Sequence, residues 1–370
     1  MKTILVILGT RPEAIKLAPV ILELKKQPGY RVLVCNTEQQ KELSNQTLSF
    51  FGINADYKLD VMRPNQTLPG VQARILSALS GIYEQNTIDA TIVQGDTMTV
   101  FCGALVSFYN KVPVYHVEAG LRSYDLFEPF PEEAMRQMTA RITELHFAPT
   151  QKAVDALLQE GIDSERIFMT GNTVIDALSC LSDGVMALAE SELGNMGVCL
   201  NDKLVLITVH RRENHGERLD RILSAICELT ARYPDHQFVL PVHPNPNVHD
   251  KVYAALESKS NVILTPPLDY PELVCMMKHT KLVLTDSGGI QEEAPTFGNP
   301  VLVMRYETER TEGVEAGFAK LVGADKELIL QECAVVLDQD KTFTRLDGSK
   351  NPYGDGHAAK HIFDIIKERN

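Results

Sequence analysis

KLVLTDSGGIQEEAPTFGNPVLVMRYETER, residues 281–310, is the stretch from which the fold of this chain is predicted. Residues 281–286 read as a buried strand and residues 287–289 as a tight turn. A short helix over 290–298 follows, and a second buried strand over 300–304 closes the unit. Strand, helix and strand in this order form the β-α-β unit of a parallel sheet, whose faces are covered by helices. Ligands of such sheets collect at the carboxyl ends of the strands, so the turn is a candidate ligand loop.

The turn carries small residues that favour an anion. Two glycines before a helix let backbone N–H groups approach a negative ligand, so Ser287, Gly288 and Gly289 are a candidate phosphate cradle. Glu292 and Glu293 would repel phosphate alone, and at least one of them is better explained as an acceptor for sugar hydroxyls. The predicted ligand therefore has a phosphate and a ribose. The alternative, a plain turn followed by two solvated glutamates, stays open because glycine pairs before helices are common.

Length, charge and cysteine content narrow the class of protein. A chain of 370 residues is too long for one typical core and suits two domains. The formal net charge of -13 argues against nucleic acid or a membrane surface as a partner, so an anionic ligand must be held by local cations. No apolar run approaches the ~20 residues of a membrane span. Seven cysteines without a CxxC pair predict reduced thiols and a cytoplasmic protein.

The amino-terminal residues place two cations beside a predicted helix. Residues 3–8 read as a buried strand rather than a signal peptide, because a charged loop follows the short apolar run. A helix then starts at Pro12, and Arg11 and Lys16 bracket its first turn. Both cations add to the positive potential of the helix end. The alternative is a solvated pair of charges.

Two later strands end in acidic residues. Residues 90–94 read as a strand that stops just before Asp96, and residues 112–118 as a strand that ends at Glu118. A carboxylate at converging strand ends is costly unless it is paired or takes part in chemistry, so both are candidate functional groups. The alternative is a helix cap, above all for Asp96.

A third acidic site follows in the segment 123–138. Glu132 and Glu133 fall in the first turn of a predicted helix that starts at Pro131. Taken alone, they are ordinary first-turn acids that favour the helix dipole.

A basic strand end opens the second half of the chain. The predicted strand over 203–209 runs into His210, Arg211 and Arg212. Arginines offer planar donors and histidine titrates near neutral pH, a combination that suits a diphosphate. Packing of the histidine in the core is the alternative. His210 and His215 lack the HExxH pattern, so no zinc site is predicted.

The order of elements predicts the architecture. Both halves alternate strand and helix, and the drift to small and polar residues over 171–197 marks the best boundary. The sequence therefore predicts an α/β protein of two Rossmann-like, doubly wound parallel-sheet domains that face a central cleft.

A series of short motifs runs in order along nearly the whole chain: GTRPEAIK, QGDT, HVEAGLRS, PFPEE, GNTVIDAL, HRREN, PVHPNP, TDSGGIQEEAP, VLVMR, TER and NPYGDG. This series resembles the non-hydrolysing UDP-N-acetylglucosamine 2-epimerase family. The resemblance implies a fold of the glycosyltransferase-B type. It also implies a first domain over 1–170 plus 355–370, with a returning last helix, and a UDP-binding domain over 171–354.

The resemblance further implies the reaction and the residues that perform it. The family interconverts UDP-N-acetylglucosamine and UDP-N-acetylmannosamine through 2-acetamidoglucal, without a cofactor or a metal, usually as a homodimer, and supplies bacterial surface polysaccharide. By motif, the catalytic residues are Asp96, Glu118, Glu132 and His210. The residues that bind UDP are Arg11, Lys16, Ser287, Gly288, Gly289, Glu293 and Arg310.

The family also has a regulatory site for a second, activating substrate molecule. Its residues correspond to Gln39, Glu42, Glu133, Arg211 and His243. Here the chain departs from the family, because TEQQKEL replaces TGQHREML, and Leu273 replaces an aromatic residue near the uracil.

Two other functions remain open: a 2-epimerase for a related UDP-2-acetamido sugar, and a glycosyltransferase of the same fold.

Overall fold

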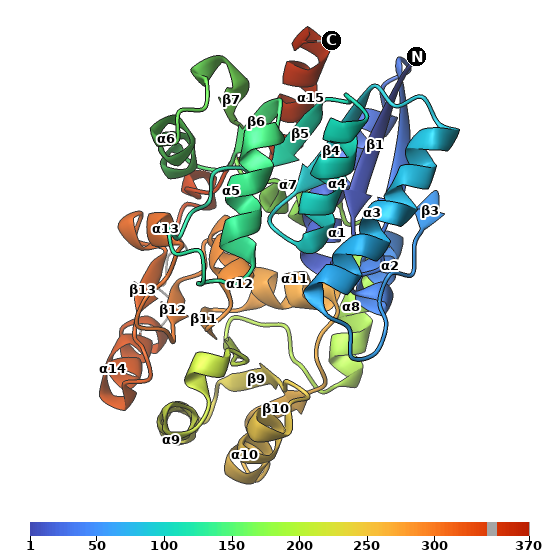
Figure 1. The fold of residues 1–370 in the computed structure, drawn as a ribbon. Helices are drawn as coiled ribbons and strands as arrows, with labels where there is room; N and C mark the ends of the chain where they lie inside the picture. Colours follow the sequence, from blue (N-terminus) through green and yellow to red (C-terminus); the bar gives the residue numbers. More distant parts are fainter. Residues whose placement is uncertain (339–345, 370) are drawn as a thin grey trace. The chain divides into compact units, whose positions relative to one another are not determined.

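The computed structural model describes residues 1–338 and 346–369 (Figure 1). The chain divides into two compact units: unit 1 is Met1–Cys180 with Tyr353–Asn370, and unit 2 is Leu181–Pro352. Each unit is built on one wholly parallel sheet, which confirms the predicted fold class of two doubly wound α/β domains. Residues 339–345 of the predicted UDP-binding domain and Asn370 of the predicted returning segment lie outside the described residues.

Unit 1 holds a seven-stranded sheet with the order β3-β2-β1-β4-β5-β6-β7. Its strands are β1 (Lys2–Leu8), β2 (Tyr30–Asn36), β3 (Tyr57–Lys58), β4 (Ala90–Gln94), β5 (Val114–Val117), β6 (Leu145–Ala148) and β7 (Ile167–Met169). Its helices are α1 (Arg11–Lys25), α2 (Lys41–Phe50), α3 (Leu68–Gln85), α4 (Met98–Tyr109), α5 (Glu132–Ile142), α6 (Gln151–Gln159), α7 (Thr173–Cys180) and α15 (Ala358–Arg369). The strand order reverses between β1 and β4, and in such sheets the ligand crevice lies at this point.

Unit 2 holds a six-stranded sheet with the order β10-β9-β8-β11-β12-β13. Its strands are β8 (Leu204–Thr208), β9 (Gln237–Pro241), β10 (Val262–Thr265), β11 (Leu282–Thr285), β12 (Val301–Val303) and β13 (Ala319–Leu321). Its α-helices are α8 (Asp183–Asn195), α9 (Glu217–Arg232), α10 (Pro246–Leu256), α11 (Tyr270–His279), α12 (Gly288–Glu293), α13 (Thr311–Glu315) and α14 (Lys326–Leu337). The order reverses between β8 and β11, so the equivalent crevice lies there.

The strands form because their residues are apolar and β-branched and are covered on both faces. In β1 every residue after Lys2 is buried, which is the pattern of a central parallel strand. Separate clusters of buried side chains fill the two units, one around Leu5, Ile7 and Val93 and the other around Val205, Ile207 and Leu284.

Hydrogen bonds at the N-cap fix the start of helix α1. Thr10 is its N-cap, and Glu13 completes a capping box by accepting a hydrogen bond from the Thr10 N–H. Pro12 occupies the first turn, where its missing N–H costs nothing. The first residues after β1 are therefore fixed closely against the sheet.

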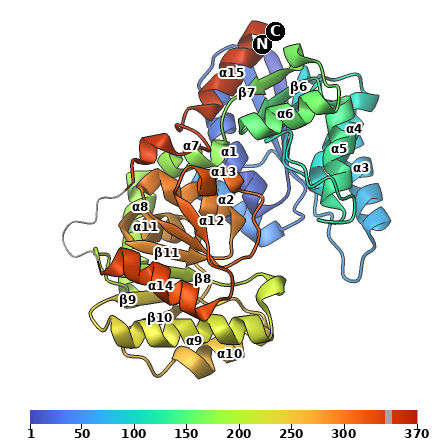
Figure 2. The ribbon, with the colours of Figure 1, turned by 90° about the vertical axis from the view of Figure 1, so that its left-hand side faces the viewer.

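The last helix completes unit 1. Helix α15 packs against α1 and α7, so both chain termini lie in this unit (Figure 2). Asp176 of α7 holds the start of α15, because its carboxylate accepts hydrogen bonds from the N–H groups of Ala358 at 3.2 Å and Ala359 at 2.8 Å. The packing of α7 on α1 also explains why unit 1 extends past the predicted boundary at 170.

One local prediction is wrong. Residues 287–289 do not form a separate turn, because Ser287 is the N-cap of α12 and the helix begins at Gly288.

The seven cysteines are all free thiols, and Cys199 is exposed. No helix within residues 1–338 and 346–369 combines the length and apolar character that crossing a membrane requires.

Candidate functional site

At the point in unit 1 where the strand order reverses, one buried carboxylate links two loops. Glu13 accepts hydrogen bonds from the N–H groups of Gly9 at 2.6 Å and Thr10 at 2.9 Å, after β1. It also accepts one from the hydroxyl of Thr97, after β4. Burial raises the pKa of Glu13 to about 7, although these hydrogen bonds act to lower it. Glu13 therefore holds the loops that carry Arg11 and Asp96.

Glu118 and Lys16 form a buried ion pair at the end of β5. The Lys16 ammonium donates to the Glu118 carboxylate, and both side chains are at most 10% exposed. The Gln94 amide at the end of β4 donates to the same carboxylate oxygen at 2.9 Å. Glu118 also has a φ of 61°, a left-handed conformation that a residue with a side chain adopts at a cost. Lys16 is therefore not a solvated charge, and the Glu118 side chain is held by residues of α1 and β4.

Asp96 pairs with a residue from α5. The Arg136 guanidinium contacts Asp96 Oδ2 at 2.9 Å through Nε and at 2.6 Å through its terminal nitrogen. Asp96 is not a helix cap, because Thr97 is the N-cap of α4 and accepts from the N–H of Val100. The Asp96 carboxylate is therefore held by Arg136 of α5 and not by the start of α4.

The two glutamates at the start of α5 differ in their surroundings. Glu133 is buried and accepts hydrogen bonds from the Ser123 N–H, Arg136 and Gln137. Burial alone raises the pKa of Glu133, but these hydrogen bonds hold it below its usual range. Glu132 is half-buried in the first turn and makes no side-chain hydrogen bond within the part of the chain that the structure describes.

In unit 2, at the point where the strand order reverses, the loops are organised around Asp286, directly after β11. Its buried carboxylate lies 2.9 Å from Nδ1 of His210, which follows β8. It also accepts from the N–H groups of His210 and Arg211 and from the Asn214 side chain. The His210 side chain is 40% exposed, so the alternative of a core-packed histidine is wrong.

The candidate phosphate loop is tied to the TER segment. Arg310 Nε donates to Glu292 at 3.0 Å, and the Thr308 hydroxyl donates to Gln291 of α12 at 2.8 Å. A Cβ added to Gly288 would lie 3.2 Å from the Arg310 guanidinium carbon, whereas one added to Gly289 meets nothing within 4 Å. The guanidinium therefore lies against the Gly288 backbone.

The glutamates of α12 are not solvated. Glu292 is 3% exposed and Glu293 is 5% exposed, so the alternative of two solvated acids is wrong. Glu292 pairs with Arg310, whereas Glu293 is the one that the family resemblance assigns to UDP binding.

The residues predicted for a regulatory site lie in both units, and each has its own surroundings. In unit 1, Gln39 accepts a hydrogen bond from the Thr99 hydroxyl at 3.0 Å, and Glu42 is exposed. In unit 2, the His243 ring stacks on His210 with 6.3 Å between the ring centroids. Burial and the neighbouring His210 lower the pKa of His243. The Arg211 side chain approaches Gly288, where an added Cβ would lie 3.5 Å from its terminal nitrogen.

Several residues of these networks were not predicted, and three of them contact predicted site residues directly. Gln94, Arg136 and Asp286 were not proposed as site residues, although Gln94 and Asp286 lie inside the motifs QGDT and TDSGG. The position of Asp286 directly after a buried strand was the available signal, the same one that identified Asp96 and Glu118. No local signal marks Arg136, whose partner Asp96 is 40 residues away.

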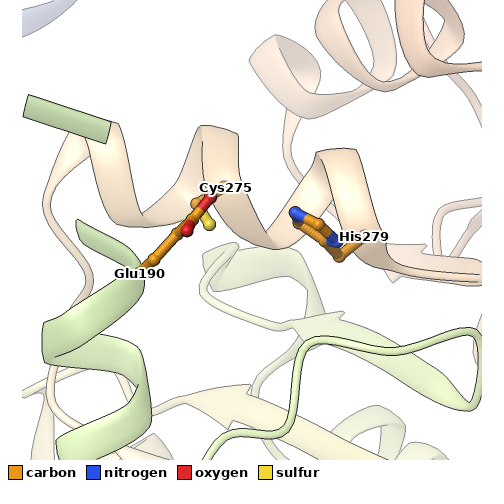
Figure 3. A group of neighbouring side chains, drawn as sticks. All are labelled: Glu190, Cys275 and His279. Carbon is orange, nitrogen blue, oxygen red and sulfur yellow. The ribbon is translucent and has the colours of Figure 1, made fainter. Parts of the chain in front are cut away.

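One group of side chains could offer metal ligands among the described residues. Cys275 and His279 lie one turn apart on α11 and face Glu190 of α8, with their ligand atoms within 4.8 Å of one another (Figure 3). Burial and the neighbouring Glu190 raise the pKa of the Cys275 thiol to about 11, so at neutral pH it carries a proton rather than the charge of a metal ligand. Helix α11 ends before β11 starts, so His279 lies at the opposite edge of the sheet from Asp286. No metal is assigned to this group.

Comparison with known proteins gives one consistent result. The sequence profile of the family described as UDP-N-acetylglucosamine 2-epimerase matches residues 22–367. A UDP-N-acetylglucosamine 2-epimerase of Neisseria meningitidis serogroup A is 44% identical over 370 residues, which cover 99% of this chain and 100% of that protein.

Solved structures agree. The crystal structure of UDP-GlcNAc 2-epimerase from Neisseria meningitidis bound to UDP-GlcNAc matches with a TM-score of 0.89 and 44% identity, covering 100% of both chains. The Methanocaldococcus jannaschii UDP-GlcNAc 2-epimerase in complex with UDP-GlcNAc and UDP matches with a TM-score of 0.80 and 33% identity, again over 100% of both chains.

Proposed function

Because this chain belongs to the UDP-N-acetylglucosamine 2-epimerase family, we propose that it interconverts UDP-N-acetylglucosamine and UDP-N-acetylmannosamine by inverting carbon 2 of the sugar. The observation that carries this proposal is the full-length match at 44% identity, and the acids at successive strand ends of unit 1 support it. A glycosyltransferase would share the fold but has no evident need for these acids.

The chemistry explains why carboxylates and cations are both needed. The proton on carbon 2 is weakly acidic, because no carbonyl lies beside that carbon in the ring. In the proposed reaction a base takes this proton, a double bond forms between carbons 1 and 2, and UDP leaves carbon 1 with the electron pair of the broken C–O bond. UDP then adds back to the resulting 2-acetamidoglucal while carbon 2 receives a proton on its other face. The reaction is redox-neutral, so it needs no cofactor.

We assign the proton transfers to the carboxylates of unit 1, namely Asp96, Glu118 and Glu132. Glu118 is ion-paired with Lys16, which holds its carboxylate at the end of β5. Asp96 is paired with Arg136, which fixes its carboxylate at the end of β4. Proton transfer by a positioned side chain contributes about 10²–10⁴ in rate.

We assign the leaving diphosphate to His210, with UDP held by Arg11, Lys16, Ser287, Gly288, Gly289, Glu293 and Arg310. The contact of the Arg310 guanidinium with the Gly288 backbone supports this assignment, because it places a planar donor beside the loop. The burial of Glu293 suits a carboxylate that accepts from ribose hydroxyls. On this assignment unit 2, Leu181–Pro352, is the UDP-binding domain.

We propose a regulatory role for Gln39, Glu42, Glu133, Arg211 and His243, which would hold a second substrate molecule. The test is to supply UDP-N-acetylmannosamine alone and then with a trace of UDP-N-acetylglucosamine. Reaction that starts only after the trace is added supports activation, whereas an immediate full rate excludes it.

We also propose that the protein works as a cytoplasmic homodimer and supplies activated N-acetylmannosamine for surface polysaccharide. Helices α3, α4 and α5 pack beside one another and expose Leu68, Phe108, Tyr109 and Met138, which supports self-association.

Proton NMR in deuterated water tests the reaction itself. The purified protein is mixed with UDP-N-acetylglucosamine, and the anomeric signals and deuterium at carbon 2 are followed. UDP-N-acetylmannosamine with deuterium at carbon 2 is the expected product. Free N-acetylmannosamine with UDP would mean hydrolysis instead. No change, even after trace product is added, would point to a related UDP-2-acetamido sugar as the substrate.

A further inference from the structure

The carboxylate of Asp286 collects four hydrogen-bond donors from one short segment. Oδ1 lies 2.9 Å from His210 Nδ1, and the His210 N–H lies 3.1 Å from Oδ1 and 3.0 Å from Oδ2. Oδ2 also accepts from the Arg211 N–H at 2.9 Å and from Asn214 Nδ2 at 3.0 Å. The segment 210–214 is thereby fixed to the end of β11.

These donors use the full capacity of the carboxylate. An ionised carboxylate has about four acceptor positions and no proton to donate. Burial alone raises the pKa of Asp286, but the hydrogen bonds from His210, Arg211 and Asn214 hold it below its usual range. The side chain is 0% exposed, so Asp286 does not itself meet a ligand. Its effect must pass through the residues that it holds.

The pairing fixes the chemistry of the histidine ring. Because a carboxylate only accepts, the His210 nitrogen that faces it, Nδ1, must carry a proton. In the neutral ring Nε2 is then the acceptor. The His210 side chain is 40% exposed although Nδ1 faces a fully buried carboxylate, so Nε2 is the nitrogen left for a ligand.

We propose that Asp286 is a positioning residue that holds His210 in the Nδ1–H tautomer, with Nε2 presented to the substrate. The proposal rests on the proposed function, in which His210 serves the leaving diphosphate. When Nε2 carries a proton, it donates a hydrogen bond to a diphosphate oxygen. Asn214 supports this arrangement by also donating to the carbonyl of Met304 at 3.0 Å, which anchors the segment to the end of β12.

The neighbouring histidine provides an internal contrast. Nδ1 of His243 accepts a hydrogen bond from the Asn245 N–H at 3.2 Å, so its neutral ring must carry the proton on Nε2. The rings of His210 and His243 stack with 22° between their planes, yet the structure assigns them opposite tautomers. One spectrum can therefore test both assignments.

The first test uses the wild-type protein, so it does not depend on the folding of a variant. Protein labelled with ¹⁵N at histidine is studied by two-bond ¹H–¹⁵N correlation at a pH where the rings are neutral. His210→Gln and His243→Gln identify the two signals. We expect Nδ1–H for His210 and Nε2–H for His243. A His210 ring protonated on Nε2 alone would overturn the proposal.

The second test is Asp286→Asn. The new side-chain amide has one NH₂ group and one oxygen. If the NH₂ faces Nδ1, the His210 proton must move to Nε2. If the NH₂ faces the other side, it opposes the N–H donors of Arg211 and Asn214. We expect kcat to fall about 10- to 100-fold, a part of what proton transfer contributes, with UDP affinity within about threefold of wild type. Asp235→Asn, at a side chain that is 83% exposed, is the matched control and should retain wild-type kcat.

The outcomes separate this proposal from the proposed function. Asp286→Asn that folds and retains wild-type kcat would overturn the positioning role. So would a loss of UDP affinity as large as the loss of kcat, since this would mean collapse of the whole loop. If Asp286→Asn does not fold, the wild-type tautomer decides the matter. Wild-type protein that fails to epimerise any UDP sugar contradicts the proposed function, whatever the tautomer.

Discussion

Glu118 shows, at the scale of one residue, how the structure fixes a carboxylate that we propose as catalytic. It lies at the end of β5 with a left-handed backbone, and Lys16 and Gln94 fix its side chain. A strained backbone persists only where the surroundings enforce it, and such positions cluster at functional sites. The contacts of Glu118 therefore favour a role in chemistry over a role in stability.

Glu118→Gln should lower kcat by about 10²–10⁴ and leave UDP affinity nearly unchanged, because the lost charge acts on the sugar. Turnover is measured by NMR and UDP affinity by calorimetry. The control is Glu144→Gln, which changes a carboxylate that is 58% exposed and should change neither quantity. Near wild-type turnover in Glu118→Gln would remove Glu118 from the mechanism.

Arg310→Ala should weaken UDP binding at least tenfold, because a charge-assisted contact with the diphosphate is lost. Part of the effect has a local cause, since the buried Glu292 loses the partner that now donates to it at 3.0 Å. Calorimetry with UDP gives the affinity, and Arg221→Ala, at an exposed residue of α9, is the control. Unchanged UDP affinity in Arg310→Ala would show that the diphosphate assignment is wrong.

At the scale of the element, the strands and helices follow from local sequence, but their side-chain partners do not. Buried apolar runs predicted the parallel sheets, and Pro12 marked the first turn of α1. The pairing of Asp96 with Arg136, and of His210 with Asp286, joins residues 40 and 76 positions apart. Such pairs depend on which strand ends are neighbours in the sheet, and this order is not visible in a single β-α-β unit. The helix start at Gly288 was also missed, because glycine resembles a turn in sequence alone.

The capping box of α1 makes a further prediction, which concerns pH. Glu13 has an ordinary pKa of 4.5 and a pKa of about 7 in the folded protein, chiefly because of burial. The folded state therefore binds this proton more tightly than the unfolded state, and the free energy of unfolding falls as pH rises between these values. Glu13→Gln imitates the protonated group and should lack this loss.

We therefore expect the free energy of unfolding of wild type, relative to Glu13→Gln, to fall by ~1 kcal/mol between pH 6 and pH 8. Urea unfolding of both proteins at the two pH values measures the difference, and shifts from all other groups cancel in it. A difference that is the same at both pH values would contradict the assignment of this pKa to Glu13.

At the scale of the whole molecule, self-association is the property most open to test. Phe108 and Tyr109, at the end of α4, are 54% and 69% exposed, which is costly in a monomer when neighbouring helices also expose apolar side chains. Light scattering after size-exclusion chromatography should give twice the mass of one chain. Phe108→Asp should give a monomer, whereas Leu188→Asp on α8, at a side chain that is 68% exposed, should not change the mass. A wild-type monomer would refute the proposed homodimer.

The path of the chain through its two units also sets an order of events during synthesis. The strands of unit 1 are complete when Met169 has left the ribosome, but α15 belongs to the same unit and comes last. The ribosome adds about 5–20 residues per second. The apolar surface of α1 therefore stays uncovered for about ten to thirty seconds while unit 2 is synthesised. Until Ile362 and Phe363 arrive to be buried, the nascent first unit offers that surface to chaperones. A message truncated near its end therefore yields a defect in the part of the protein that was translated first.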